Sequence, residues 1–243
     1  MVSVACRDLE HRLALEVLTT DGIPTCEGIS IQVLNSNNAY LVDAGSEAAL
    51  GGIYTIGFIT HYHKDHTRFM ADISCNLYLG PELTRHSRIP KVERRYSPFE
   101  LLLLNGAVLQ TFPYSQDISK VYSNEDIEVY ALPVDHIRTL KSVGYAIKNR
   151  KTGAYVWVSG DFFRLKQPSI EFLREIKPDM AVIEVTFPSG FRRHYHQNLD
   201  SVMELIEDLE LKRCWFVHLS KKWDGQIKKI AQYLPRSGAQ FYF

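Results

Sequence analysis

Between residues 61 and 66 the chain reads His61-Tyr62-His63-Lys64-Asp65-His66. Side chains two positions apart on an extended backbone point the same way, so His61 and His63 can bind one metal ion. Asp65 and His66 then face a second ion. The residues before this segment, 55–60, have the composition of a strand, and residues 64–73 can form a helix. The sequence therefore predicts metal ligands in the loop between a strand and a helix.

Three more residues of metal-ligand type follow apolar stretches further along the chain. They are His136 after residues 131–135, Asp161 after 154–160, and His218 after 215–217. A single histidine or aspartate at the end of a strand is uninformative. Three of them in succession, after the His-x-His-x-Asp-His segment, indicate one shared site.

Length and composition are those of an ordinary globular protein. The chain has 243 residues, 45% of them hydrophobic and 23% charged, and we expect a single domain over residues 1–243. Lys plus Arg total 28 and Asp plus Glu total 28, so no overall field attracts a polyanion or an anionic membrane. No apolar run is long enough to span a bilayer, and the four cysteines form no Cys-x-x-Cys pair. These features predict a cytoplasmic protein without a membrane partner.

The apolar pattern divides the chain into two β-rich halves, each followed by helices. Strands are expected at residues 13–18, 29–34, 39–42, 55–60, 107–111, 127–133, 143–147, 154–158, 180–185 and 214–217, and the last helices at 169–176, 199–209 and 225–233. Residues 81–105 show no clear pattern. This order predicts an α+β fold with two sheets packed face to face and helices on their outer sides.

These residues resemble the metallo-β-lactamase superfamily, and the resemblance covers nearly the whole chain. Its five motifs, in order, are matched by residues 41–45 (Leu-Val-Asp-Ala-Gly), 61–66, His136, 159–161 (Ser-Gly-Asp) and 218–220 (His-Leu-Ser). The resemblance implies an αββα sandwich, the metallo-β-lactamase fold, with two mixed β-sheets, helices on the outer faces and a two-metal site at one edge of the sheets.

The resemblance also implies which residue holds which ion. The first metal ion would be held by His61, His63 and His136, the second by Asp65, His66 and His218, and Asp161 would bridge them. Asp43 would orient the site from behind, although a turn residue before Ala44 and Gly45 is an equally good interpretation. All the ligands are nitrogen or oxygen donors, which suit two divalent ions, Zn²⁺ first, with Mn²⁺ and Fe as alternatives.

The segment from residue 183 to residue 218 resembles the ribonuclease Z and cyclic phosphodiesterase branch. There a Glu-x-Thr-aromatic strand, here Glu184 to Phe187, is followed by a loop histidine, a helix and the fifth motif. In that branch the loop histidine, here His196, contacts the phosphate and assists departure of the leaving oxygen, so we expect His196 to be catalytic. Asp65, in the 61–66 segment, is the second residue that we expect to be catalytic. Arg192, Arg193 and His194 make the same loop basic and are the expected substrate-binding residues, although a solvated charged loop is an equally good interpretation. Glu184 can orient a ligand or His196, or it can be a solvated carboxylate at the end of a strand.

Other branches fit less well. Only a short segment separates His136 from Asp161, which leaves no room for the long tRNA-binding arm of ribonuclease Z. Residues 160–164 resemble the Gly-Asp-Phe-Arg segment of DNA-repair nucleases, but the domain that those enzymes insert downstream is absent. True β-lactamases place a cysteine at the second metal, and no cysteine here occupies a motif position. Related cyclic phosphodiesterases carry a cysteine-rich zinc site near the N-terminus, where Cys26 stands alone.

The predicted function is a phosphodiesterase that acts through a hydroxide activated by two metal ions. Its substrate would be a cyclic nucleotide, another small cyclic phosphodiester or a nucleic-acid end. Alternatives are a lactone, thioester or carboxylic-ester hydrolase, a nuclease related to the DNA-repair enzymes, or a metal protein without hydrolytic activity, including a di-iron relative. The resemblance further implies a homodimer. The basic stretch over residues 85–95 can be a substrate rim or a solvated face.

Overall fold

The computed structural model describes residues 2–6, 13–19, 25–35, 38–89, 100–102, 106–191, 195–224, 226 and 240–242. The chain divides into two compact units. The first unit comprises Met1–Ser115 and Ile137–Ser142, and the second comprises Gln116–His136 and Val143–Phe243. Each unit contains one eight-stranded sheet.

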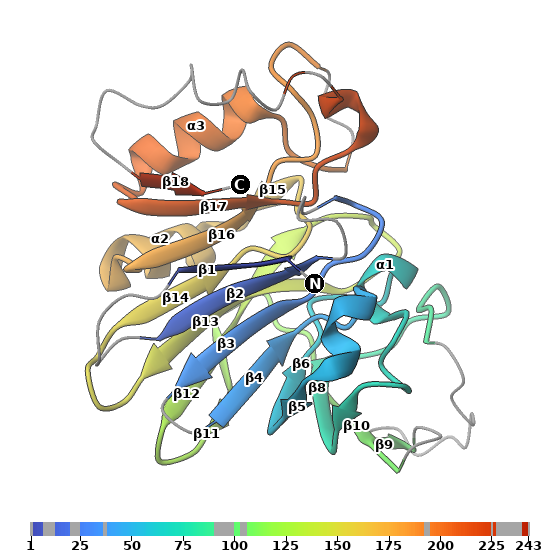
Figure 1. Ribbon diagram of the computed structural model, residues 1–243. Coiled ribbons are helices and arrows are strands. Elements are labelled where there is room, and N and C mark those ends of the chain that lie inside the picture. Colours follow the sequence, from blue (N-terminus) through green and yellow to red (C-terminus); the bar gives the residue numbers. More distant parts are fainter. Residues whose placement is uncertain are drawn as a thin grey trace. The chain divides into compact units, whose positions relative to one another are not determined.

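The sheet of the first unit begins as an antiparallel meander and continues with parallel strands (Figure 1). Its strands, in spatial order, are β1 (Val2–Cys6), β2 (Ala14–Thr19), β3 (Ile31–Asn35), β4 (Asn38–Val42), β6 (Ile56–Phe58), β8 (Leu77–Pro81), β10 (Val108–Phe112) and β9 (Glu100–Leu102). Strands β4, β6, β8 and β10 are parallel to their neighbours in this order. The unit also contains η1 (Glu47–Gly51), α1 (Lys64–Thr67) and the paired strands β5 (Ile53–Tyr54) and β7 (Ser74–Cys75). The carboxyl ends of β4, β6 and β8 therefore meet at one edge.

The sheet of the second unit has the same change from antiparallel to parallel pairing. Its strands, in spatial order, are β11 (Ser119–Ser123), β12 (Ile127–Asp135), β13 (Ser142–Asn149), β14 (Tyr155–Val158), β16 (Met180–Glu184), β17 (Arg213–Val217) and β18 (Gln240–Tyr242), and β15 (Arg164–Leu165) pairs with β12. Strands β14, β16, β17 and β18 are parallel. Their order again places the carboxyl ends of several strands at one edge.

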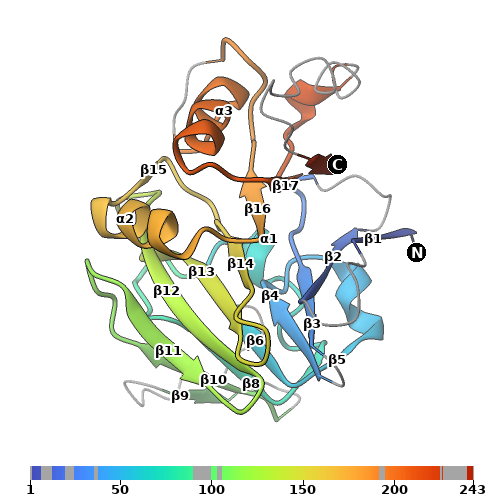
Figure 2. The same cartoon turned by 90° about the vertical axis from the view of Figure 1, so that its left-hand side faces the viewer.

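Helices α2 (Gln167–Ile176) and α3 (Leu199–Asp208) belong to the second unit (Figure 2). Asn198 caps α3, because its side chain accepts a hydrogen bond from the Ser201 amide. Leu173 of α2 and Val202 and Ile206 of α3 belong to one buried apolar cluster with Trp157 of β14. Burial of these apolar faces holds both helices against the sheet. A short 3-10 helix, η2 (Lys221–Trp223), follows β17.

The secondary structure confirms most of the expected elements. The helix expected over residues 64–73 is wrong beyond Thr67, where α1 ends. The Phe69 amide, which would donate to Asp65 O in a longer helix, donates instead to Ala44 O at 2.8 Å. The carbonyls of Asp65 and His66 accept from the amides of Ile29 at 2.9 Å and Ala44 at 2.7 Å. The apolar pattern does not predict strands β1, β5, β7, β8, β9, β11, β15 and β18. The helix expected at 225–233 lies almost wholly outside the described residues. Within the described residues, no helix is long and apolar enough to cross a membrane.

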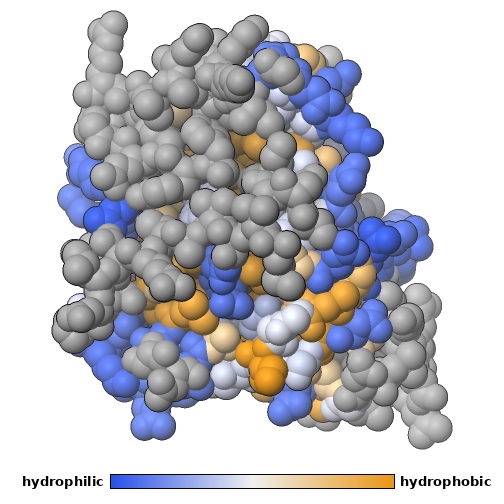
Figure 3. All heavy atoms as spheres, in the orientation of Figure 1, coloured by the Kyte–Doolittle hydropathy of each residue, from blue (hydrophilic) through white to orange (hydrophobic). Residues whose placement is uncertain are grey.

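Large apolar side chains reach the surface at scattered positions. The exposed ones include Leu50, Ile53, Leu83, Phe191 and Tyr195. On the face drawn in Figure 3, hydrophobic residues form separate patches between hydrophilic ones. Scattered exposure of this kind is normal for a globular protein.

Gly45, just after β4, lies against the backbone of the segment that carries Asp65. A Cβ added at residue 45 would lie 1.5 Å from the carbonyl oxygen of Asp65 and 2.8 Å from the amide nitrogen of Ile29. Because both neighbours are backbone atoms, neither can move aside cheaply. Gly45 is required here for this close approach rather than for an unusual backbone angle.

We therefore expect Gly45→Ala to destabilise the protein by at least about 2 kcal/mol, which lowers Tm by roughly 4–8 °C for a chain of this length. Thermal unfolding followed by circular dichroism measures the shift. Gly153→Ala is the matched control: a Cβ there meets nothing within 4 Å, although its φ of +76° makes alanine strained. An unchanged Tm in Gly45→Ala would contradict the proposed clash at residue 45.

Candidate metal centre

In the first unit, two neighbouring parallel strands, β4 and β6, end just before polar residues that include a proposed metal ligand. Asp43 follows β4, and Thr60 and His61 follow β6. The Asp43 backbone has a φ of 60°, a left-handed conformation that aspartate tolerates better than most residues. Residues at the carboxyl ends of adjacent parallel strands lie close together, which is where α/β proteins commonly bind ligands.

Asp43 is a buried carboxylate that fixes the orientation of two histidines. Its Oδ2 lies 2.8 Å from His66 Nδ1 and 2.8 Å from Thr60 Oγ1, and its Oδ1 accepts from the Thr60 amide at 2.8 Å. A carboxylate only accepts hydrogen bonds, so His66 Nδ1 and the Thr60 hydroxyl donate. Thr60 Oγ1 lies 3.1 Å from His61 Nδ1. Because the hydrogen of the Thr60 hydroxyl is donated to Asp43, Thr60 Oγ1 accepts a hydrogen bond from His61 Nδ1. Burial raises the pKa of Asp43, and the neighbouring His66 opposes that effect.

These hydrogen bonds fix the tautomers of both histidines. With hydrogen on Nδ1, His61 and His66 each keep a lone pair on Nε2. His61 Nε2 faces His63 Nδ1 at 2.8 Å, and His66 Nε2 lies 3.7 Å from Asp65 Oδ2. The first unit thus presents two donor pairs, His61 with His63 and Asp65 with His66, in the pairing that the sequence predicts.

The second unit presents its residues in the same way. Asp161 follows β14 through Gly160, Glu184 is the last residue of β16, and His218 follows β17. His218 has a φ of 61°, a second left-handed backbone at the end of a strand. Strands β14, β16 and β17 are parallel neighbours, so these side chains emerge at one edge of the sheet.

Glu184 is the counterpart of Asp43. Its Oε1 accepts from the Phe162 amide at 2.7 Å, and its Oε2 accepts from the Thr186 hydroxyl at 2.6 Å and from His196 Nδ1 at 2.9 Å. Thr186 Oγ1 also lies 2.8 Å from His218 Nδ1. Because the threonine hydrogen is directed to Glu184, His218 Nδ1 donates and its Nε2 keeps a lone pair.

The same relay therefore occurs once in each unit. A buried carboxylate binds one histidine directly and a second through a threonine hydroxyl: Asp43 with His66, and with His61 through Thr60; Glu184 with His196, and with His218 through Thr186. Partners of this kind on the outer nitrogen of a histidine orient the ring and raise its basicity as a metal ligand.

Asp161 lies at the centre of the histidines of the second unit. Its Oδ2 lies 3.3 Å from His218 Nε2, 3.6 Å from His196 Nδ1 and 3.9 Å from His136 Nε2. His136 Nδ1 donates to the carbonyl of Tyr195 at 2.8 Å, and burial lowers the pKa of His136 to about 4. A histidine binds a metal ion in its neutral form, through the lone pair of an unprotonated nitrogen. Nε2 of His136 can supply that lone pair, next to the carboxylate of Asp161.

The donor set fits divalent cations. Ligand atoms of Asp161, Glu184, His196 and His218 lie within 4.8 Å of one another, and the described donors are imidazole nitrogens and carboxylate oxygens. This chemistry suits zinc, manganese and iron. The His/Asp clusters of both units are therefore suitable for divalent metal ions, and the donors themselves do not select the metal.

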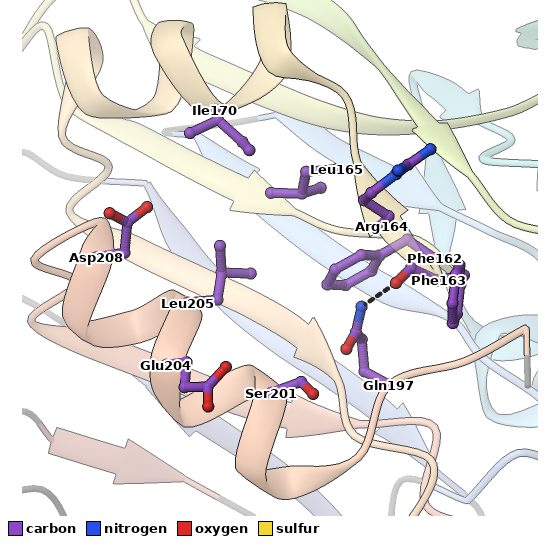
Figure 4. Close-up of a pocket in the computed structure, with 10 residues that line it drawn as sticks. All are labelled: Phe162, Phe163, Arg164, Leu165, Ile170, Gln197, Ser201, Glu204, Leu205 and Asp208. Atoms are coloured by element: carbon purple, nitrogen blue, oxygen red, sulfur yellow. Dashed lines mark hydrogen bonds between the residues drawn. The ribbon is translucent and has the colours of Figure 1, made fainter. Parts of the chain in front are cut away.

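A cavity of about 260 Å³ lies in the second unit (Figure 4). Its lining residues come from α2, α3, β15 and the two loops that carry Asp161 and His196. At one end of the cavity the side chain of Gln197 donates to the carbonyl of Phe163 at 2.6 Å. This bond ties the loop of His196 to the loop of Asp161.

The structure brings together the predicted residues that it describes. In the first unit these are His61, His63, Asp65 and His66, and in the second unit they are His136, Asp161, His196 and His218. Asp43 and Glu184 each accept a hydrogen bond from a histidine. The expected substrate-binding residues Arg192, Arg193 and His194 lie outside the described residues. The sequence motifs do not single out Thr60, and they include Thr186 only as part of the Glu-x-Thr-aromatic segment, without a role. A signal for both exists in the sequence, because Thr60 directly precedes His61 and Thr186 lies two residues after Glu184.

Comparison with known proteins agrees with this description. The profile of the beta-lactamase superfamily domain matches residues 46–219, and the chain belongs to this family. Among curated proteins, none matches the sequence significantly. Fold and family together confirm the predicted metallo-β-lactamase fold, and the superfamily is one of hydrolases.

Several solved structures share the fold over most of their length. A diphosphatase of the PhnP family is 18% identical, with 95% of each chain covered and a TM-score of 0.67. The short form of human tRNase Z, ELAC1, is 15% identical, with 86% of this chain and 93% of that chain covered and a TM-score of 0.63. Unliganded yeast PDE1 is 13% identical, with 95% and 96% covered and a TM-score of 0.64. At these identities the likeness establishes the fold.

Removal of one threonine hydroxyl tests the relay. We expect Thr186→Val to weaken divalent metal binding by about 10–100-fold, because His218 loses the partner that fixes its tautomer. Competition with a chromogenic chelator measures the affinity, and ¹⁵N chemical shifts of the histidines report the tautomer. Thr186→Ser keeps the hydroxyl and is the matched control, expected to bind metal like the parent. Equal affinities for the valine and serine variants would show that the relay does not support binding.

Proposed function

We propose that this chain is a metal-dependent phosphodiesterase. The proposal rests first on one observation: His196 Nδ1 is held by the buried Glu184 at 2.9 Å and lies 3.6 Å from Asp161 Oδ2. A histidine fixed in this way beside a metal-ligand carboxylate can serve as a proton donor to a leaving group. The likeness in fold to a diphosphatase, a tRNase and PDE1 supports the same reaction class.

The proposed ligands follow the resemblance to the superfamily. His61, His63 and His136 would hold one divalent ion, Asp65, His66 and His218 the other, and Asp161 would bridge them. Zinc is the proposed metal. Two such ions supply a water of lowered pKa and stabilise negative charge on the attacking and leaving oxygens.

The chain's own residues complete the reaction. Glu184 accepts from His196 Nδ1, so the opposite nitrogen, Nε2, is the one that gives a proton to the departing oxygen. His196 is partly exposed, which allows substrate to reach it, whereas Glu184 is buried. A buried carboxylate on Nδ1 stabilises the imidazolium before transfer and holds the ring in place afterwards. Arg192, Arg193 and His194, on the same loop, would bind the anionic substrate. We also propose a homodimer, as the resemblance implies.

A panel of chromogenic substrates tests the function. Metal-reconstituted protein and its His63→Ala variant are compared on bis(p-nitrophenyl) phosphate, a chromogenic lactam and a thioester. We expect turnover of the phosphodiester alone, and loss of both bound metal and activity in the variant. Turnover of an acyl substrate in place of the phosphodiester would reject the phosphodiesterase in favour of an ester, lactone or thioester hydrolase.

A further inference from the structure

Two surface turns of the first unit are bonded to each other. Residues 84–87 form one turn, in which the Ser87 amide donates to Thr84 O at 3.0 Å. Residues 137–140 form the other, in which the Leu140 amide donates to Ile137 O at 2.9 Å. The Thr84 hydroxyl joins them by donating to Thr139 O at 2.9 Å. Residues 84–88 and 137–141 are called the turn pair below.

The turn pair presents positive charge to solvent. Arg85, Arg88 and Arg138 are exposed, as is His86, which accepts from Arg85 Nε at 3.0 Å. Lys141 is half-buried, and its Nζ lies 4.0 Å from Glu82 Oε1. No carboxylate within the described residues forms an ion pair with any of the three arginines. Since the chain as a whole is neutral, this concentration of cations is a local feature.

The turn pair is fixed to the segment that carries the metal ligands. Residues 82–88 leave the carboxyl end of β8, the parallel neighbour of β6, and β6 leads directly into Thr60 and His61. The Arg88 amide donates to Tyr62 O at 2.8 Å. The Thr67 hydroxyl donates to Arg88 O at 2.6 Å, so Arg88 is attached at both ends of the segment 62–67. The cations therefore lie at the same edge of the sheet as His61 and His63.

We propose that the turn pair binds the phosphates of a single-stranded nucleic acid beside the bond that is cleaved. This inference rests on the proposed phosphodiesterase function and narrows its substrate to a polynucleotide. A cyclic mononucleotide has a single phosphate, and that phosphate would lie at the metal centre. Such a substrate therefore has no second phosphate for the arginines to bind. A strand supplies further phosphates along its backbone, and an arginine guanidinium binds phosphate through two parallel hydrogen bonds. The joined turns hold Arg85, Arg88 and Arg138 in place for such contacts.

Salt-dependent binding is the direct readout. Fluorescence anisotropy of a labelled single-stranded oligonucleotide with a cleavage-resistant phosphorothioate backbone gives its affinity over a range of NaCl concentrations. For Arg85→Gln/Arg88→Gln, we expect the slope of log affinity against log salt to decrease by about 1.4. This corresponds to roughly 20-fold weaker binding at about 0.1 M salt.

Two matched variants separate the turn pair from general charge. Arg174→Gln/Lys177→Gln makes the same change in net charge on the second unit, where these residues pair with Asp208 and Glu210, and we expect it to bind like the parent. Arg85→Lys/Arg88→Lys keeps both charges and is expected to retain the salt slope. An unchanged slope in the glutamine variant, or an equal decrease in the control on the second unit, would overturn the proposal.

The test is independent of the proposed function. Anisotropy is measured without turnover, whereas hydrolysis of bis(p-nitrophenyl) phosphate by the parent reports the phosphodiesterase. Hydrolysis together with oligonucleotide binding that does not depend on the turn pair would reject this inference alone. Failure of every phosphodiester to react would reject the proposed function, whatever the oligonucleotide does.

Discussion

Replacement of Asp161 by alanine is expected to remove tightly bound metal and hydrolytic activity together. Asp161 Oδ2 has three histidine nitrogens within 3.9 Å, and we propose that it bridges both ions. Mutation of a residue that only hydrogen-bonds to a metal ligand typically weakens metal binding by about 10–100-fold. Loss of a ligand shared by both ions should therefore weaken metal binding by more than about 100-fold. Metal content after dialysis, measured by plasma mass spectrometry, together with chelator competition gives this value.

The matched control is Asp208→Ala. Asp208 is an exposed carboxylate on α3 that pairs with Arg174 at 2.6 Å, so its removal changes the charge of the second unit by the same amount. We expect this control to keep its metal. Full metal content in Asp161→Ala would contradict the bridging role and leave only the histidines as ligands.

Replacement of His196 by alanine is expected to lower kcat while leaving the bound metal in place. General acid catalysis contributes about 10²–10⁴-fold, so we expect a loss of this size on a substrate with a poor leaving group, such as a dinucleotide. p-Nitrophenolate departs without a proton, and hydrolysis of bis(p-nitrophenyl) phosphate should therefore fall much less. Comparison of the two substrates isolates proton transfer from any general damage to the site.

Two outcomes would contradict this role for His196. An equal loss on both substrates would mean that the histidine positions the phosphate and transfers no proton. A loss of metal from His196→Ala would make it a ligand, together with Asp161, Glu184 and His218, whose ligand atoms lie within 4.8 Å of one another and of His196.

The candidate metal ligands that can be predicted from the sequence are those that lie in a short motif or directly after an apolar strand. The His-x-His-x-Asp-His segment carries its own geometry, because alternate side chains on extended backbone share a side. Asp161 and His218 could be found because each follows a short apolar strand. The parallel order of β14, β16 and β17 then brings them to one edge, as the chain order of the motifs predicts.

The features that the sequence did not reveal depend on contacts between distant segments. The roles of Thr60 and Thr186 become visible only in the structure, where each hydroxyl lies between a carboxylate and a histidine. The early end of α1 has the same origin, since the Phe69 amide donates to Ala44 O instead of to Asp65 O. Strand β8 was obscured because it ends in Gly80 and Pro81, which are typical of turns.

The histidines of both units are oriented before any cation arrives. Nδ1 of His66 is held by Asp43, and Nδ1 of His61 and His218 is held by the hydroxyls of Thr60 and Thr186. Because these rings already have one orientation, little side-chain freedom is lost when a metal ion binds, and this preorganisation favours high affinity.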